Sequence, residues 1–349
     1  MSNHRSLLVV VVVLLLTAAA CTSDSGTSSN SSSSVTTVPL PTTELRYGFS
    51  AGDTYTYSLD MSQHVVLDTQ GAASAVTDQE LPGAADVQID ATGTFVYTVD
   101  DGTDPGTYQI SIEGDFSDVQ VSGTADGEKV TQPSDLPQLG NISPVSQTIV
   151  VDARGQVLDQ SRSPQDLFGL GGTPLAGLSG DLGQFVGPVL PADPVGQGDS
   201  WSLDYSNPDL GDEPVQVSTT ATLTGTETVD GVETLVIESE TKTDEGTVDL
   251  ADFFRGFLGA FGGGSTPDAT TLPDLDQLVF RITTAPSTGN SRSWFDPDRG
   301  LMIRSTSSGP TSLTMDVTLP DDSGDLQQFT MNLDTSQTLD YRLVEGGTG

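Results

Sequence analysis

Side chains that could carry out covalent chemistry are scarce in this 349-residue sequence. It contains one cysteine, Cys21, and two histidines, His4 and His64. A single cysteine cannot form an intrachain disulfide, and so few sulfur and imidazole groups give no basis for a zinc site. A Ser-His-Asp triad would have to use His64 on a predicted strand, and Gly177-Leu178-Ser179-Gly180 lacks the pattern of a nucleophile elbow. We therefore predict that the protein is not an enzyme and has no metal or other cofactor.

Aspartates are plentiful and gather in predicted turns. Asp100-Asp101-Gly102-Thr103-Asp104, Asp296-Pro297-Asp298 and Asp321-Asp322-Ser323-Gly324-Asp325 each bring several carboxylates together. A calcium loop needs roughly six to eight oxygen ligands, and none of these segments shows the full spacing. Aspartate before glycine is also what tight turns favour, so the segments predict turns and leave calcium binding open.

Cys21 lies where a lone cysteine has a defined chemical role, directly after an export-type segment. Arg5 precedes the apolar block Leu7–Leu16, and Thr17-Ala18-Ala19-Ala20 follows it. This stretch is too short to span a bilayer as a helix, which needs about 20 residues, but it has the layout of a secretory signal. It resembles the signal segment of bacterial lipoproteins, although that family prefers leucine at the position of Ala18. The resemblance implies cleavage before Cys21 and a diacylglycerol group on its sulfur. The alternative is ordinary cleavage after Ala20, which releases a soluble protein with a free thiol.

The predicted anchor sets the location of the protein. We expect residues 1–20 to be a lipoprotein signal peptide and residues 21–43 to be a disordered Ser/Thr-rich tether, because such a composition cannot bury a core. Two acyl chains hold a protein to a membrane where one chain would not. The expected location is the extracytoplasmic face of the cell membrane, reached through a lipid anchor.

The charge of the chain restricts its partners. Forty-nine acidic residues face 12 basic ones, for a net charge of −37. Such a surface repels nucleic acid and anionic headgroups. We predict no nucleic-acid partner, and a membrane partner only through the N-terminal anchor.

Hydrophobic residues alternate with polar ones along most of the chain. Tyr55, Tyr57 and Leu59 alternate with threonine and serine, and the notable further segments of this kind are Val87–Ala91, Phe95–Val99 and Leu235–Thr241. This period of two predicts antiparallel strands with one buried and one solvated face.

Two short segments recur about 145 residues later in the chain. Gly52-Asp53-Thr54-Tyr55 returns as Gly198-Asp199-Ser200-Trp201, and Arg154-Gly155-Gln156-Val157-Leu158 returns as Arg299-Gly300-Leu301-Met302-Ile303. The recurrence indicates a duplicated β-meander, with generic turn chemistry as the alternative. We predict a first β unit over 44–162, an apolar helical and Gly-rich insertion over 163–194, and a second β unit over 195–345.

Two apolar segments break the alternation and favour helices. Within 249–262, residues Leu250, Phe253, Phe254, Phe257, Leu258 and Phe261 form one helical stripe. In the insertion, Thr173-Pro174 is typical of a helix start, with Leu178 and Phe185 on one side after it. The predicted fold is mainly β, a large curved antiparallel sheet, in one piece or as two duplicated β-meander units. One or two amphipathic helices pack on one face, where they either close the core or form a lid over an apolar cavity.

The segment Trp294-Phe295-Asp296-Pro297-Asp298-Arg299-Gly300-Leu301 resembles uncharacterised exported bacterial lipoproteins, as does Val195-Gly196-Gln197-Gly198-Asp199-Ser200-Trp201. The overall layout is similar to that of LolA-type and LppX-type lipoprotein and lipid carriers. This similarity implies that the sheet could hold acyl chains on its concave face.

The leading interpretation is a membrane-tethered, non-enzymatic lipoprotein of the cell envelope that binds an apolar ligand or lipid. The alternative is a structural or protein-interaction module with a fully packed core. The candidate site residues are Cys21 for lipidation and six residues for an apolar ligand: Phe168, Leu178, Phe185, Phe253, Phe257 and Phe261.

Overall fold

The described part of the chain is built from strands. The computed structural model describes residues 42–71, 83–131, 145–161, 187–207, 215–249, 279–320 and 326–348. The strands in chain order are β1 (Asp53–Gly71), β2 (Ala84–Asp101), β3 (Thr107–Ala125), β4 (Glu128–Val130), β5 (Val145–Asp152), β6 (Val157–Ser161), β7 (Ser200–Asn207), β8 (Val215–Val229), β9 (Val232–Thr243), β10 (Gly246–Asp249), β11 (Val279–Thr284), β12 (Ser287–Asp296), β13 (Leu301–Pro320) and β14 (Leu326–Thr348). Within these ranges no helix has the length and apolar character needed to cross a membrane.

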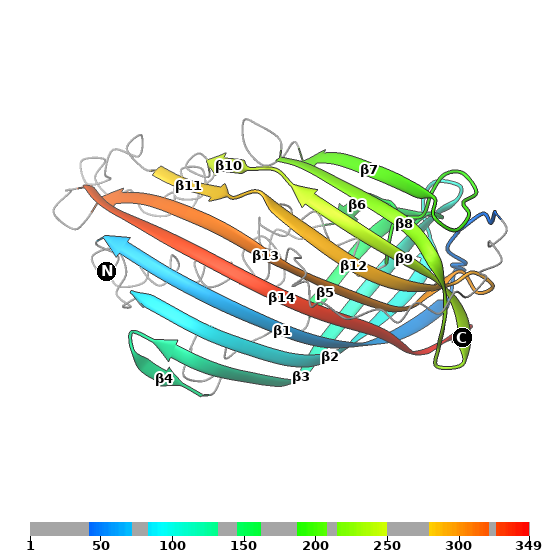
Figure 1. Cartoon of the computed structure of the whole chain (residues 1–349), viewed down its shortest axis with the longest axis horizontal. Helices are drawn as coiled ribbons and strands as arrows, with labels where there is room; N and C mark the ends of the chain where they lie inside the picture. Colours follow the sequence, from blue (N-terminus) through cyan, green and yellow to red (C-terminus); the bar gives the residue numbers. More distant parts are fainter. Residues whose placement is uncertain are drawn as a thin grey trace, which may run out of the picture.

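All the strands belong to one antiparallel sheet, shown in Figure 1 as a strongly curved layer. Its main order is β6-β5-β3-β2-β1-β14-β13-β12-β9-β8-β7. Strands of the first half of the chain thus lie on one side and those of the second half on the other. The two sides meet where β1 pairs with β14 along its whole length, from Asp53 opposite Thr348 to Gly71 opposite Phe329. The two halves therefore share one sheet.

Alternating side chains give the sheet an apolar face and a polar face. In β2, Ile89, Phe95 and Tyr97 are buried, whereas Asp90 and Thr94 are exposed. This is the period-two pattern that the sequence predicts, and the antiparallel strands of the prediction are confirmed. The polar face carries many of the acids and hydroxyls, and the apolar face forms the core.

We use two names for the ends of the sheet. The turn end is the end at which β1 begins and where the turns 102–106, 153–156 and 297–300 lie. The far end is the opposite one. Register shifts fall toward the turn end, at Thr56/Tyr57, Thr92/Gly93, Val150/Val151, Leu223/Gly225 and Trp294/Phe295. A β-bulge bends its strand and increases the local twist, so these shifts help the sheet to curve there.

The predicted fold class is wrong about helices packed on one face of the sheet. The described residues are all-β, with 78% in strands and none in helix. Asp249, the expected first residue of a helix over 249–262, is instead the last residue of β10 and lies opposite Arg281 of β11. At the turn end, two extended segments rather than helices pack on the apolar face: residues 42–50 and 187–199. The rest of the two predicted helices lies outside the described residues.

Candidate functional site

The seven residues that the sequence singles out cannot be placed in this fold. Cys21 and the six candidate ligand-lining residues lie outside the described residues: Phe168, Leu178, Phe185, Phe253, Phe257 and Phe261. The structure therefore does not test whether these side chains form one site.

Among the titratable groups, the sequence singles out His64 and the aspartate-rich segments. The His64 imidazole is about half exposed on β1 and lies 2.8 Å from Asp86 Oδ1. Asp296, from one of the aspartate-rich segments, accepts backbone N–H bonds from Asp298 and Arg299 at 3.0 and 3.1 Å. No group of three or more histidine, cysteine, aspartate or glutamate side chains within the described ranges could hold a metal ion.

Two aspartate turns lie at the turn end, one from each half of the chain. Asp152 Oδ1 accepts the backbone N–H groups of Arg154 and Gln156 at 2.8 and 2.9 Å. Asp296 Oδ1 does the same for its own turn, and a glycine with positive φ follows in each, Gly155 at 80° and Gly300 at 64°. These turns contain the second recurring segment but differ in length: Gly155 N–H donates to the carbonyl of Asp152 three residues earlier, whereas Gly300 N–H donates to that of Asp296 four residues earlier. The duplication itself stays a prediction.

Residues 42–50 bridge these two turns. Tyr47 N–H donates to Ala153 C=O at 2.8 Å, and Gly48 N–H donates to Gly300 C=O at 2.9 Å. The approach is close, because a Cβ added at Gly300 would lie 2.3 Å from the Gly48 nitrogen. Thr43 forms an isolated bridge with Val195, so residues 42–50 are fixed to the second extended segment as well.

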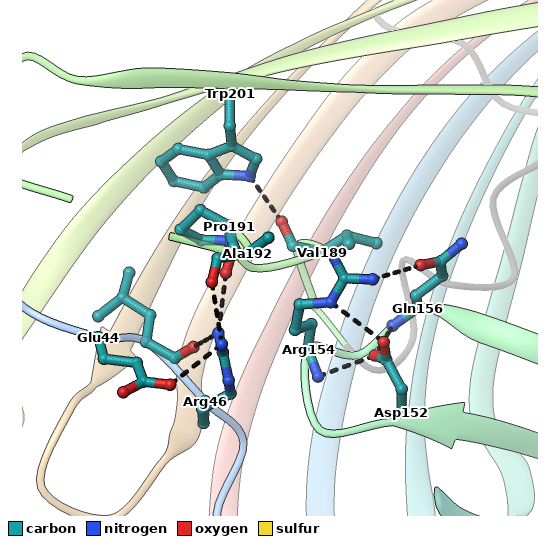
Figure 2. A network of polar contacts seen from close by, with 10 residues as sticks. Glu44, Arg46, Asp152, Arg154, Gln156, Val189, Pro191, Ala192 and Trp201 are labelled. Atoms are coloured by element: carbon teal, nitrogen blue, oxygen red, sulfur yellow. Dashed lines mark hydrogen bonds and ion pairs between the residues drawn. The ribbon is translucent and has the colours of Figure 1, made fainter. Parts of the chain in front are cut away.

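Arg46 holds the two extended segments together (Figure 2). Its guanidinium donates to the carbonyls of Leu45, Pro191 and Ala192 at 2.7, 2.8 and 3.0 Å, and it lies 3.1 Å from a carboxylate oxygen of Glu44. Trp201 of β7 donates its indole N–H to Val189 C=O at 2.8 Å. Three charge-assisted bonds to backbone carbonyls make Arg46 a fixed clamp rather than an available binding group.

Below this clamp lies a packed cluster, which we call the turn-end core. It combines Leu45, Tyr47, Leu190 and Val195 of the two extended segments with strand residues such as Phe95 and Phe295. Tyr47 stacks on Phe49 with ring centroids 5.0 Å apart and meets Phe295 edge-on at 5.5 Å. Burial raises the pKa of Tyr47, Tyr57, Tyr97 and Tyr341, because the ionised phenolate would lose its hydration. The turn-end core is filled by the chain itself.

The apolar face continues beyond this core toward the far end. There Met315 lies opposite Met331 and Ile282, and Val317 lies opposite Phe329. We call this the far-half apolar surface, and its buried members are Val65, Val87, Ile282, Leu313, Met315, Val317, Phe329, Met331 and Leu333. None of them belongs to the turn-end core. The hydroxyl of Thr69, opposite Met331, is buried and has no hydrogen-bond partner.

The polar face carries a groove that sequence reasoning missed. It crosses eight strands, from β3 through β1 and β14 to β8, and encloses about 1150 Å³. Two in-register rows line it. One runs from Asp118 through Asp60 and Asp340 to Thr222, and its neighbour runs from Gln120 to Thr220. We call it the cross-strand groove. In the sequence its residues are ordinary solvent-facing strand positions, so only the sheet order brings them together.

A cationic cluster borders one side of this groove. The guanidinium groups of Arg292 and Arg304 lie 5.3 and 5.2 Å from the Trp294 ring centroid. Arg304 bonds both oxygens of Asp340, which raises the pKa of its guanidinium, and Arg292 pairs with Glu227 and with Glu238. The Trp294 indole N–H donates to Glu227 at 2.7 Å. Both arginines are therefore committed to partners within the protein.

Comparisons with known proteins give no family for this chain. No family model matches it, and no relative is found among curated proteins. Among solved structures, it is similar to lipovitellin, from a structure described for its lipid–protein interactions, at 11% identity and a TM-score of 0.37. That match covers 86% of this chain but only 26% of the lipovitellin chain.

Two bacterial structures match over nearly their full lengths. One is a protein from Bacteroides fragilis that is thought to be exported and has a YmcC-like fold; the identity is 11%, the TM-score 0.23, and the coverage 87% of this chain and 99% of that one. The other is a candidate lipoprotein from Parabacteroides distasonis, at 10% identity and a TM-score of 0.22, with coverage of 82% and 97%. At these TM-scores the similarities carry no argument about function.

Proposed function

We propose that this protein is a membrane-tethered, non-enzymatic lipoprotein of the cell envelope that binds an apolar ligand or lipid on the far-half apolar surface. The observation that carries the proposal is the contrast along one face of one sheet. At the turn end, the chain's own Leu45, Tyr47 and Leu190 complete the core. The far-half apolar surface continues the same face with nine further apolar side chains outside this core, all 0–4% exposed, so a ligand there would lie in an enclosed apolar interior.

The composition of the far-half apolar surface suits an apolar ligand of variable shape. Met315 and Met331 face each other across β13 and β14, and both are almost completely buried. Methionine is unbranched and polarisable, so paired methionines adapt to ligands of different shape. The unpartnered hydroxyl of Thr69 beside them could bond a polar group of an otherwise apolar molecule.

The tether part of the proposal rests on the sequence. A thioether-linked diacylglycerol on Cys21 would hold to the membrane a chain whose net charge of −37 disfavours direct contact with anionic headgroups. Replacing Cys21 with serine should move the protein from the membrane fraction to the soluble fraction of fractionated cells. A C21S protein that stays with the membrane would show that the anchor lies elsewhere.

Ligand binding is tested by native mass spectrometry of gently purified protein. We expect co-purified lipid on the wild type and less lipid per folded molecule in the M315Q/M331Q double variant. The matched control is M302Q, which places the same polar group in the turn-end core, where Met302 is 1% exposed. This control should lose stability but keep its lipid content. A wild-type spectrum free of any bound mass would favour the alternative, a structural module with a fully packed core.

A further inference from the structure

Charge is unevenly compensated along the cross-strand groove. On the side of β8, β9 and β12–β14, the acids have cations: Glu238 pairs with Arg292, Asp340 with Arg304, and Glu240 with Lys242 at 2.6 Å. On the side of β1–β3, the exposed carboxylates of Asp60, Asp90 and Asp118 have no ion pair with any described residue. Asp90 accepts from Ser62 at 2.6 Å and Asp118 from Gln120 at 3.3 Å, both neutral donors.

The spacing of these three carboxylates defines what could neutralise them. Asp60 and Asp118 are both register partners of Thr92, so they lie two strands apart, about 9.6 Å in the sheet. Asp60 and Asp90 are diagonal neighbours on adjacent strands, about 7–8 Å apart. One ion cannot bridge carboxylates so far apart. Like charges on one face of a sheet repel each other, so a ligand with several separated positive charges would relieve this repulsion.

The shape of the groove selects an extended ligand. Its eight strands span about 34 Å from the first to the last, which matches about ten residues of extended polypeptide. The strands between β3 and β8 are hydrogen-bonded on both sides along the groove, so a segment that crosses them cannot join the sheet as another strand. At the β3 end, residues 115–122 pair only with β2 among the described strands. Recognition across the groove must therefore come from side chains: carboxylates at the β1–β3 side, and hydroxyl and amide groups such as Thr338, Ser308 and Asn290 further along.

We propose that the cross-strand groove is a docking site for an extended, lysine- or arginine-rich polypeptide segment of a partner protein. Its basic side chains lie over Asp60, Asp90 and Asp118, and its polar part follows the rows toward β8. Acidic residues alone would not define a site in a chain with 49 of them. These three differ because they line the groove, while the other acids there already have cations. This site is on the opposite face from the far-half apolar surface and does not depend on lipid binding.

The test compares two triple variants with the same change of charge. D60N/D90N/D118N neutralises the groove, and D100N/D101N/D104N neutralises three exposed aspartates in and beside the turn 102–106. The probe is a fluorescein-labelled ten-residue peptide of alternating lysine and serine, added to the C21S chain and followed by fluorescence anisotropy. We expect saturable one-to-one binding, weakened about tenfold by the groove variant and less than twofold by the control, since each exposed ion pair contributes modestly.

Three results would overturn the proposal. Equal weakening by both variants would mean that the peptide responds only to net charge. Absence of saturable binding to the wild type would exclude the site. Displacement of the peptide by an equimolar amount of the polyamine spermine would show that a small cation, not a polypeptide, is the occupant. Melting curves of both triple variants test whether each is folded. If the groove variant does not fold, the single variant D60N replaces it and should weaken peptide binding by a smaller factor.

Discussion

At the turn end, residues 42–50 and 187–199 lie on the apolar face, and Arg46 holds them together through the carbonyls of Leu45, Pro191 and Ala192. Toward the far end, the same face carries Met315, Met331 and Phe329 outside that cluster. The two regions differ in residue type as well. The turn-end core is rich in tyrosine and phenylalanine, whose ring contacts fix their geometry, whereas the far-half apolar surface is mainly aliphatic and methionine. Both regions are equally buried, so they differ in how their side chains pack: ring contacts fix the turn-end core, and flexible aliphatic and methionine side chains fill the far half.

The largest effect on stability should come from the buried tyrosines of the turn-end core at alkaline pH. Tyr47, Tyr57, Tyr97 and Tyr341 have raised pKa values in the folded protein, so they bind protons more tightly than in the unfolded chain, where the value is 10.0. Their stabilising effect is complete below about pH 10 and is lost as pH rises above it, because only the unfolded state ionises. Each contributes about 1.4 kcal/mol per pH unit, so the free energy of unfolding should fall by on the order of 5 kcal/mol by pH 11. Urea unfolding between pH 8 and 11 measures this. Tyrosinate absorbance of these four residues at pH 10 in the folded protein would contradict the packed turn-end core.

Truncating one buried ring in each region should separate packing from ligand binding. Phe95 and Phe329 are both 1% exposed. Phe95→Ala should lower the free energy of unfolding by about 3–5 kcal/mol, whether or not bound lipid has been extracted with detergent. Phe329→Ala should lower the free energy of unfolding by a similar amount in the lipid-loaded protein. After extraction the loss should be about 1–2 kcal/mol smaller, because the wild-type ring then no longer packs against lipid. Urea titrations before and after extraction decide this. If extraction changes the loss of stability of neither variant, both regions are packed by protein alone.

A methyl group added at a turn glycine should have unequal effects at the two ends. Gly127, in the far-end turn between β3 and β4, has a φ of 80° and nothing within 4 Å of an added Cβ. Gly127→Ala should therefore cost only the conformational strain, about 1–2 kcal/mol. Gly300→Ala adds a backbone collision with Gly48 and must displace residues 42–50, for a total of about 2–4 kcal/mol. Thermal melting of the two variants gives the difference. Equal melting temperatures would mean that residues 42–50 can shift away from the added methyl group with little loss of stability.

The smallest effect should come from the clamp itself. Arg46→Gln removes charge-assisted bonds to Pro191 and Ala192 and should lower the free energy of unfolding by about 1–2 kcal/mol. The control at the far end is Lys129→Gln, an exposed side chain whose replacement should change stability by less than about 0.5 kcal/mol. Hydrogen exchange at the Tyr47 and Gly48 amides provides a local readout. Unchanged protection of these amides in the Arg46 variant would mean that the backbone hydrogen bonds alone fix residues 42–50.

Sequence patterns predicted the strands but not the order in which they pair. The alternation at Tyr55, Tyr57 and Leu59 predicts a half-buried strand because it reflects local geometry. The pairing of β1 with β14 joins residues from opposite ends of the chain, and no local signal records it. Hence neither the single sheet nor the cross-strand groove, which depends on that pairing, could be derived beforehand.

For the described residues, the prediction of helices packed on the sheet was wrong for a related reason. A stripe of apolar residues indicates that a segment needs a buried surface, but extended segments can meet the same need. Leu45, Tyr47 and Leu190 are buried in segments without helix, fixed by turns and by Arg46 rather than by an i→i+4 pattern. The seven candidate residues, Cys21 among them, lie outside the described residues, so their roles stay predictions.

The pairing of the first and last long strands has a consequence for the order of assembly. Synthesis proceeds from the N-terminus, so β1, β2 and β3 can form hairpins early, while the other edge of β1 waits for residues 326–348. Until then that edge and the open side of β13 present unpaired backbone groups, which invite pairing with other chains. We expect the β1–β14 pairing to form late, so a chain that ends before β14 should aggregate rather than fold with one strand fewer.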